Sequence, residues 1–239
     1  MIVQIAMLAA QRGLDSERIN ALLNSAPPRW SLHASAEQCA DDLALLIRPL
    51  NAGELIVRVA APLSENDDWQ ISVVAHDRPG LLAITSAVLA AHDLSITGAR
   101  ATSWPNGVAL QSVSVGVVGP SSVDPAWPSI GQALRNALAS AKPTPGPGAF
   151  SAAWVRACDD LEVTESGKRL QVVVSTEDKV GVLAAISYAL ASAGANVVSA
   201  EISSIEGVVH DVFVIDVPAG AEARVNALLA THRASDSPG

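Results

Sequence analysis

The sequence has few aromatic residues, only two cysteines and no cluster of basic residues. Phe, Trp and Tyr make up 3% of its 239 residues, so a hydrophobic core must be built from Val, Ile, Leu and Ala. Cys39 and Cys158 form no Cys-x-x-Cys pair and are expected to be free thiols in a reducing compartment. The formal net charge of −9 would repel a phosphate backbone, so nucleic-acid binding is not expected.

Long hydrophobic runs are also missing. The apolar start, residues 1–10, has no basic segment before it, is interrupted by Gln4, and is followed by Gln11 and Arg12. It is too short to span a bilayer and does not match a secretory signal peptide. We therefore expect a cytoplasmic protein that does not bind membranes.

A repeat is the most informative feature that the sequence does contain. The motif at residues 77–82, Asp-Arg-Pro-Gly-Leu-Leu, returns 101 residues later at 178–183 as Asp-Lys-Val-Gly-Val-Leu. The same offset relates further identical residues, such as Ala99 and Ala200. Matches in the same order over this length indicate two copies of one unit.

The patterns before the first copy are helical. Apolar periodicity predicts helical structure within residues 2–23, broken at Gly13, and a second helix that begins after Ser35 as N-cap and ends before Pro49. Residues 1–50 are therefore predicted to be a helical lead-in, with no recognisable chemistry.

Each copy predicts the element order β-β-α-β-β-α. The first copy has expected strands at 54–61, 69–75, 95–103 and 108–118 and helices at 79–92, with Pro79 in the first turn, and 126–140. The second has expected strands at 152–157 or slightly longer, 170–176, 196–204 and 208–217 and helices at 180–193 and 221–231. In a βαββαβ sandwich the last strand lies beside the first, so the extra strand at the start of each copy is expected to fill that place.

These elements predict an α+β protein with two ferredoxin-like sandwiches in tandem after the short helical segment. The predicted domains are 51–141 and 150–233, joined by a Pro/Gly-rich linker at 142–149 and followed by a frayed tail at 234–239. The third predicted strand of each copy would be an exposed edge in an isolated unit. The short linker favours pairing of these edges within one chain, while a homodimer through the remaining edges stays possible.

The residues around the repeated motif resemble an ACT domain, a small regulatory module that binds amino acids. In the first copy the resemblance is carried by the motif, its helix, and residues 94–101 and 107–113. In the second copy it is carried by Gly181 and residues 195–200 and 207–214. The fold expected from this resemblance is the tandem sandwich described above.

A wider resemblance covers roughly residues 27–229. The segment Pro28–Leu32, the strand at Leu55–Val59 and the tandem pair are similar to the C-terminal regulatory region of bacterial PII uridylyltransferases. The sequence has no Gly-Ser and Asp-x-Asp metal site of a nucleotidyltransferase, and its His-Asp dipeptides lack the companion ligands of a metal-dependent hydrolase. The resemblance therefore implies a sensor without enzyme activity, cofactor or metal site.

The turn that leads into the first helix of each copy is the candidate ligand site. A helix N-terminus offers unpaired N–H groups to a carboxylate, glycine permits close approach to the backbone, and aspartate can accept hydrogen bonds from an α-ammonium group. The candidate residues are Asp77, Arg78, Gly80, Leu81, Ser95, Asp178, Lys179, Gly181, Val182 and Asn196. The resemblance implies that Asn196 is a ligand contact, that Ser95 is its weaker equivalent, and that ligand lies where two sheets pair.

Alternatives remain for both the site and the function. Each aspartate could merely cap its helix, and Arg78 and Lys179 could be solvated instead of contacting a ligand carboxylate. The resemblance implies a non-catalytic regulator of nitrogen or amino-acid metabolism that binds a small amino acid, with glutamine as first candidate. The alternative is a ligand-blind interaction module that docks on a separate enzyme or on the PII signal protein.

Overall fold

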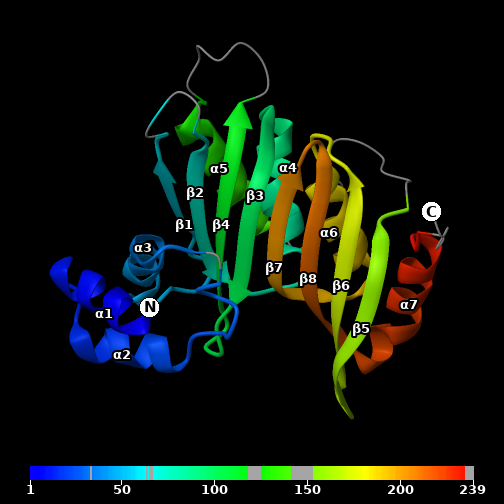
Figure 1. The fold of residues 1–239 in the computed structure, drawn as a ribbon, viewed down its shortest axis with the longest axis horizontal. Helices are drawn as coiled ribbons and strands as arrows, with labels where there is room; N and C mark the ends of the chain where they lie inside the picture. The colour runs from blue at the N-terminus through cyan, green and yellow to red at the C-terminus, as the bar shows by residue number, and fades with distance from the viewer. Residues whose placement is uncertain (33, 63, 65–66, 118–124, 141–152, 235–239) are drawn as a thin grey trace.

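One antiparallel sheet runs through the chain, with the strand order β1-β2-β4-β3-β7-β8-β6-β5 (Figure 1). The computed structural model describes residues 1–32, 34–62, 64, 67–117, 125–140 and 153–234. The first half of the sheet contains β1 (Ile56–Ala60), β2 (Trp69–His76), β3 (Leu94–Ser103) and β4 (Val108–Val117). The second half contains β5 (Val155–Thr164), β6 (Gly167–Glu177), β7 (Asn196–Ile205) and β8 (Val208–Pro218). The two halves have the same strand order, as the repeat predicted.

The extra strand of each half occupies the predicted place. β1 pairs with β2, which pairs with β4, and β5 pairs in the same way with β6, which pairs with β8. β5 is longer than the predicted strand at 152–157 and forms a tight hairpin with β6. Residues 159–164 are all exposed, so they lack the apolar alternation that would have predicted a strand there.

The two halves are joined by antiparallel pairing of β3 with β7. Ala101 lies opposite Ala200 at this joint, with Gly98 opposite Ser203 at one end and Thr102 opposite Ser199 at the other. The predicted edge-to-edge pairing is therefore confirmed. The predicted linker at 142–149 and residues 235–239 of the predicted tail lie outside the described residues, and the domain boundaries stay a prediction.

Two helices from each half cover one face of the sheet (Figure 1). They are α4 (Leu81–Ala91) and α5 (Trp127–Ala139) in the first half, and α6 (Val182–Ala193) and α7 (Glu222–Thr231), preceded by a 3₁₀ turn at Ala219–Ala221, in the second. A single hydrophobic cluster runs beneath them from Val73 and Leu134 to Phe213 and Val225. Because this cluster includes both halves, the helix-covered side of the molecule shares one core.

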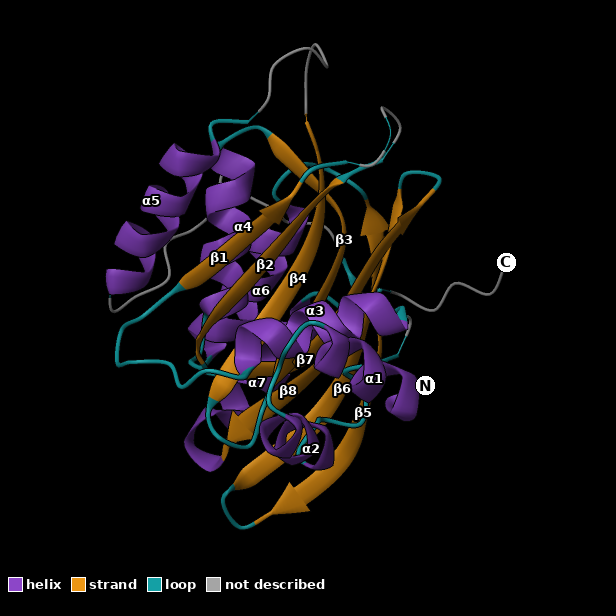
Figure 2. Ribbon diagram, turned by 90° about the vertical axis from the view of Figure 1, so that its left-hand side faces the viewer, coloured by secondary structure: helices purple, strands orange, loops and turns teal. Residues whose placement is uncertain are grey.

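The N-terminal helices cover the opposite face of the first half. They are α1 (Ile2–Gln11), α2 (Ser16–Asn24) and α3 (Ala36–Leu46), and Figure 2 shows them across the sheet from α4, α5 and α6. Their core packs Ile5, Ile19 and Leu43 together with Val74 and Leu110 of the sheet. This confirms the helical lead-in. Among the described residues, no helix has the length and apolar character needed to cross a membrane.

Candidate functional site

Both repeated turns enter their helices with the same backbone geometry. Gly80 and Gly181 are the N-caps of α4 and α6, with φ of 84° and 87°, a left-handed conformation that costs other residues about 1–2 kcal/mol. α4 begins at Leu81, so the prediction that Pro79 lies in its first turn is wrong. The positive φ explains why: a glycine must precede the helix, and this places the proline outside it.

Neither aspartate of the repeated motif caps its helix. α4 and α6 both lack a side-chain hydrogen bond at the N-cap. Asp77 Oδ2 instead accepts a hydrogen bond from Asn196 Nδ2 at 3.1 Å, and Asp178 Oδ2 accepts one from Ser204 Oγ at 2.5 Å. The helix-capping alternative is therefore wrong, and one of these two aspartates bonds across the boundary between the halves.

The joint between β3 and β7 creates two small cavities, each of which combines a turn from one half with elements of the other. The first interface site contains Asp77, Arg78, Gly80, Leu81 and Asn196 among its lining residues. Sequence reasoning grouped Asn196 with its own copy, whereas the structure places it in the other half's site. In an antiparallel pair the start of β7 lies beside the end of β3, and β3 ends next to the Asp77 turn.

The second interface site has a less polar lining. It is formed by Lys179, Gly181 and Val182, facing Leu94 and Ile96 of β3. Neither Ser95 nor Asp178 is among the residues that line it. The structure thus brings together five of the ten predicted residues at the first site and three at the second.

The first interface site holds three buried polar atoms that have no hydrogen-bond partner among the described residues. They are Arg78 Nη2, Gln111 Oε1 and Ser187 Oγ. The side chains of Gln111 and Ser187 are each 2% exposed, and leaving such a group unpaired costs about 1–3 kcal/mol. A cluster of unpaired groups in one cavity is unusual in a folded protein and indicates a place where a ligand could supply the missing hydrogen bonds.

Two of these residues, Gln111 and Ser187, were not predicted from the sequence. Gln111 lies in β4 on the helix-covered face, two residues from buried Ala109 and Val113, and Ser187 lies in α6 among apolar residues. A glutamine on the apolar face of a strand is the signal that could have found this site. Arg78 is not fully solvated, because its Nη2 atom is buried. Lys179 is solvated, as the alternative predicted: its Nζ forms an exposed ion pair with Glu177 at 2.7 Å.

Comparison with known proteins decides the family of the second half of the sheet. Residues 170–234 match the family model of the ACT domain. This segment is an ACT domain. The first half repeats its strand order and its turn, so the fold is two ferredoxin-like units in tandem, which we call the first and the second unit. The presence of an ACT domain supports a role for this chain in amino-acid-sensing regulation.

Relatives of known identity extend this likeness over most of the chain. The bifunctional uridylyltransferase/uridylyl-removing enzyme of Burkholderia vietnamiensis is 30% identical over 195 residues, which is 77% of this chain and 22% of that enzyme. The corresponding enzyme of Burkholderia lata gives 30% identity with the same coverage. The chain thus spans about a fifth of the length of these relatives. Among solved structures, aspartate kinase from Synechocystis has a TM-score of 0.41 and 19% identity, covering 68% of this chain and 26% of the kinase.

Both interface sites are closed in this structure. Each has a free volume of about 10 Å³, which is the room of roughly one water molecule. The wall of the first site contains residues of α4 and of α6, one helix from each unit. A ligand larger than one water molecule would therefore have to displace residues that line the site in this structure.

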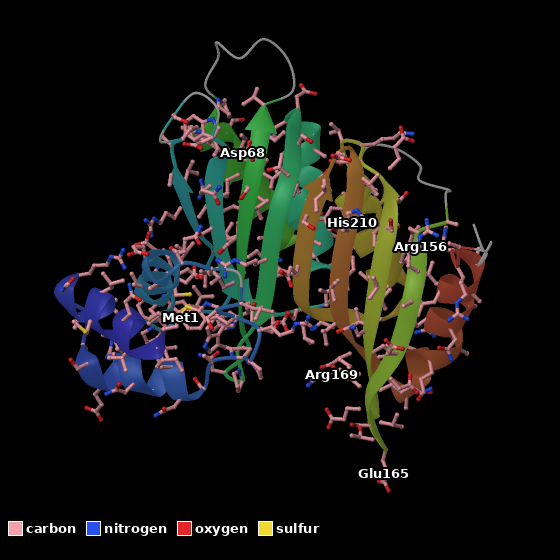
Figure 3. All side chains as sticks on the ribbon, viewed as in Figure 1. Met1, Asp68, Arg156, Glu165, Arg169 and His210 are labelled. Atoms are coloured by element: carbon pink, nitrogen blue, oxygen red, sulfur yellow. The ribbon has the colours of Figure 1, made fainter. Side chains whose placement is uncertain are left out.

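The second ACT unit carries an acid where the first carries Gln111. This residue, Asp211, is fully buried; its Oδ1 accepts a hydrogen bond from the Ser203 N–H at 3.3 Å, while Oδ2 has no partner among the described residues. Burial raises the pKa of Asp211 to about 8; the Ser203 hydrogen bond opposes this and the Asp178 carboxylate adds to it. Its neighbour His210 is exposed on β8 (Figure 3), so the two side chains do not form a metal-binding pair.

The face of the sheet beneath α3 carries a wider groove of about 500 Å³. Its cationic side chains already have partners: Arg58 bonds to Asp41 at 3.0 Å, and Arg100 lies 3.6 Å from Asp42. The two arginines of this groove therefore have carboxylate partners, in contrast to Arg78 Nη2 at the first interface site.

Proposed function

We propose that this chain is a non-catalytic regulatory module that binds a small amino acid at the first interface site. The observation that carries the proposal is the group of three buried, unpaired polar atoms on Arg78, Gln111 and Ser187 beside the Asp77 turn. A zwitterion offers complementary groups. Arg78 and the N-terminus of α4 suit its carboxylate, and Asp77 suits its ammonium group.

The two remaining unpaired atoms favour a ligand with a neutral polar side chain. Gln111 Oε1 needs a donor, and Ser187 Oγ can both donate and accept. A carboxamide supplies an N–H donor and a carbonyl acceptor together. Glutamine is therefore the first ligand to test, in agreement with the resemblance to uridylyltransferases.

Ligand entry supplies a route for signalling. The ligand's ammonium group would compete with Asn196 for Asp77, and the ligand itself would separate α4 from α6. A ligand that prefers the open arrangement shifts the population of unit pairings in proportion to that preference. We infer that a partner, either a PII-type signal protein or a separately encoded enzyme, reads this change.

Isothermal titration calorimetry of the full chain with the twenty amino acids tests the proposal. We expect a dissociation constant between micromolar and millimolar, or about −4 to −8 kcal/mol, for at least one neutral polar amino acid. Arg78→Met should weaken binding about tenfold or more, because it removes a charge-assisted hydrogen bond. Lys179→Met is the matched control, since Lys179 is exposed and paired with Glu177. Absence of binding, or equal binding by the Arg78 variant, would refute the site.

A ligand-blind interaction module is the second candidate, and the closed state of the site favours it. Asn196 already satisfies Asp77, and the free volume is that of about one water. Under this hypothesis a purified PII-type protein would be retained on the immobilised chain equally well with and without glutamine. Retention that changes with glutamine would support the amino-acid sensor instead.

A further inference from the structure

We propose that the N-terminal helices α1, α2 and α3 are the part of this chain that responds when the pairing of the two units changes. A short segment between α2 and α3, residues 29–32, ties these helices to both units at once, and we call it the strap. A displacement at the β3–β7 joint would break one of its contacts and loosen the helices from the sheet. The inference deepens the proposed function, on which its biological role rests, by naming the element that carries the signal.

The strap lies across the joint, on the face of the sheet opposite α4 and α6. Thr102 and Ser199 pair at the joint and alternate with residues of the core beneath those helices, so their side chains face the other way. Arg29 and Leu32 line a small cavity together with these two residues and with Arg100, Glu201, Val212 and Val214. The cavity has a free volume of about 10 Å³, the room of roughly one water molecule, so the strap packs closely on strands of both units.

Adjacent residues of the strap are bonded to different units. Trp30 is held by the first unit: its carbonyl accepts a hydrogen bond from Arg100 Nη1 at 2.9 Å, and its ring packs edge-on against Trp104. Arg29 is held by the second unit, because its Nη1 donates to Gln171 Oε1 at 2.9 Å. Consecutive Cα atoms are only about 3.8 Å apart, so units that move apart by several ångströms cannot keep both contacts.

The strap is also bonded to α3. Trp30 Nε1 donates to Asp42 Oδ2 at 3.1 Å, and Asp42 is only 3% exposed. Arg100 Nη2 lies 3.6 Å from the same carboxylate. A shift of Trp30 or of β3 therefore weakens the compensation of a buried charge on α3, which is costly. Because α1, α2 and α3 share one core, we expect them to loosen together, which would uncover the apolar sheet residues Val74 and Leu110.

A short route through the backbone connects the first interface site to the same strap. The Asp77 N–H donates to the Gly107 carbonyl at 2.8 Å, and the Gly107 N–H donates to the Trp104 carbonyl at 2.9 Å. Trp104 in turn contacts Trp30. The strap is thus linked to the Asp77 turn through Trp30 and to the second unit through Arg29. Such contacts transmit a change only if both ends respond, and this response can be measured.

Hydrogen exchange of the full chain without ligand, followed by mass spectrometry, tests the inference with α5 as internal reference. Global unfolding raises the exchange of α3 and α5 equally, whereas detachment of the N-terminal helices raises that of α3 alone. Gln171→Met removes the contact of the strap with the second unit. We expect α3 to exchange about tenfold faster relative to α5, because a hydrogen bond to a charged group is lost. Unchanged relative exchange of α3 in this variant would overturn the inference.

Arg29→Met separates coupling from a local effect on the strap. It removes the same hydrogen bond from the other side, so we expect the same acceleration of α3, and no further acceleration in the double variant with Gln171→Met. Arg18→Met, the same change at an exposed arginine of α2, is the matched control and should leave α3 unchanged. A response of α3 to Arg29→Met but not to Gln171→Met would show a local role only and would contradict the proposal.

Ala200→Leu perturbs the joint from the opposite face of the sheet. Ala200 lies opposite Ala101 beneath the helices and is 4% exposed, so the larger side chain must displace its neighbours. The relative exchange of α3 should rise about tenfold, but should not rise further when Gln171→Met is already present. Ala221→Leu is the control, because Ala221 is equally buried in the second unit but lies in the turn before α7. A folded Ala200→Leu chain with unchanged α3 would overturn the inference; if this variant does not fold, Gln171→Met and Arg29→Met still decide.

These measurements need no ligand, so they separate the inference from the proposed function. If α3 responds as expected in a chain that binds no amino acid, the strap is supported and the proposed first site is refuted. If the chain binds an amino acid but α3 does not respond to Gln171→Met, the first site stands and the inference falls.

Discussion

At equivalent residues the two units have the same backbone conformation but differ in the chemistry of their side chains. Gly80 and Gly181 have nearly the same positive φ, and the aspartate before each donates its N–H to a glycine carbonyl at 2.8 Å. At the equivalent strand position, however, the first unit has Gln111 and the second has Asp211. Backbone identity therefore makes the units similar in fold, while one side chain gives them different electrostatic properties.

The buried carboxyl of Asp211 should make stability depend on pH. Its folded pKa, about 8, lies above the value of about 3.9 expected in the unfolded chain, so the folded state binds the proton more tightly. This contribution is fully present below pH 4 and is lost as the pH rises through 8, at about 1.4 kcal/mol per pH unit in between. The free energy of unfolding can be measured by urea denaturation at pH 5, 6 and 7. Its fall with rising pH should be smaller in Asp211→Asn than in the unmodified chain, by about 1.4 kcal/mol per pH unit.

The matched control for this measurement is Asp216→Asn. Asp216 lies on the same strand, but its carboxylate is partly exposed and bonded to Arg169. Its removal should lower stability slightly, because the ion pair with Arg169 is lost. A slope in Asp211→Asn equal to that of the unmodified chain would show that Asp211 does not titrate as described.

At the scale of elements, the start of α4 and α6 depends on glycine. Replacing Gly80 or Gly181 by Ala places a Cβ at positive φ, which should lower the free energy of unfolding by about 1–2 kcal/mol in each case. Gly220→Ala is the control, because Gly220 has no positive φ and no atom within 4 Å of the added Cβ. Equal unfolding midpoints for Gly80→Ala and Gly220→Ala in urea would contradict this account.

The attachment of the N-terminal helices to the sheet centres on a buried acid. Trp30 Nε1 donates to Asp42 Oδ2 at 3.1 Å, and Arg100 Nη1 donates to the Trp30 carbonyl at 2.9 Å. Trp30→Phe removes the donor to Asp42 and should cost about 1–3 kcal/mol beyond the change in packing. The control is Trp104→Phe: Trp104 packs edge-on against Trp30 and is equally buried, but its Nε1 has no partner among the described residues. Equal losses of stability in the two variants would exclude this role for the hydrogen bond.

The elements themselves were largely predictable, because local patterns determine them. Alternation gave the strands, and Ser35 with Gln38 forms the capping box that begins α3. The length of β5 was not predictable, because its outer half is exposed on both faces. The residues of the first interface site could not all be predicted either. Asn196 and Asp77 are 119 positions apart in the sequence, and the antiparallel pairing of β3 with β7 brings them together.

At the scale of the whole molecule, the two units form one structure instead of two that merely share a chain. β3 and β7 pair directly, one hydrophobic cluster spans both units, and Arg29 Nη1 reaches from the N-terminal segment to Gln171 of the second unit at 2.9 Å. A ligand that opened the interface would therefore work against contacts distributed over the entire sheet. In the proposed function, these shared contacts would couple the small binding site to a change that a partner protein can detect.

This shared core should make unfolding cooperative. In Trp154→Phe the remaining tryptophans, Trp30, Trp69, Trp104 and Trp127, belong to the N-terminal segment and the first unit, so fluorescence reports that part alone. Circular dichroism at far-ultraviolet wavelengths reports both units. We expect urea transitions from the two signals to coincide, because exposing the β3–β7 joint in either unit uncovers the core of the other. Two separated midpoints would mean that the units unfold independently, and an interface that weak could not transmit a binding event from one unit to the other.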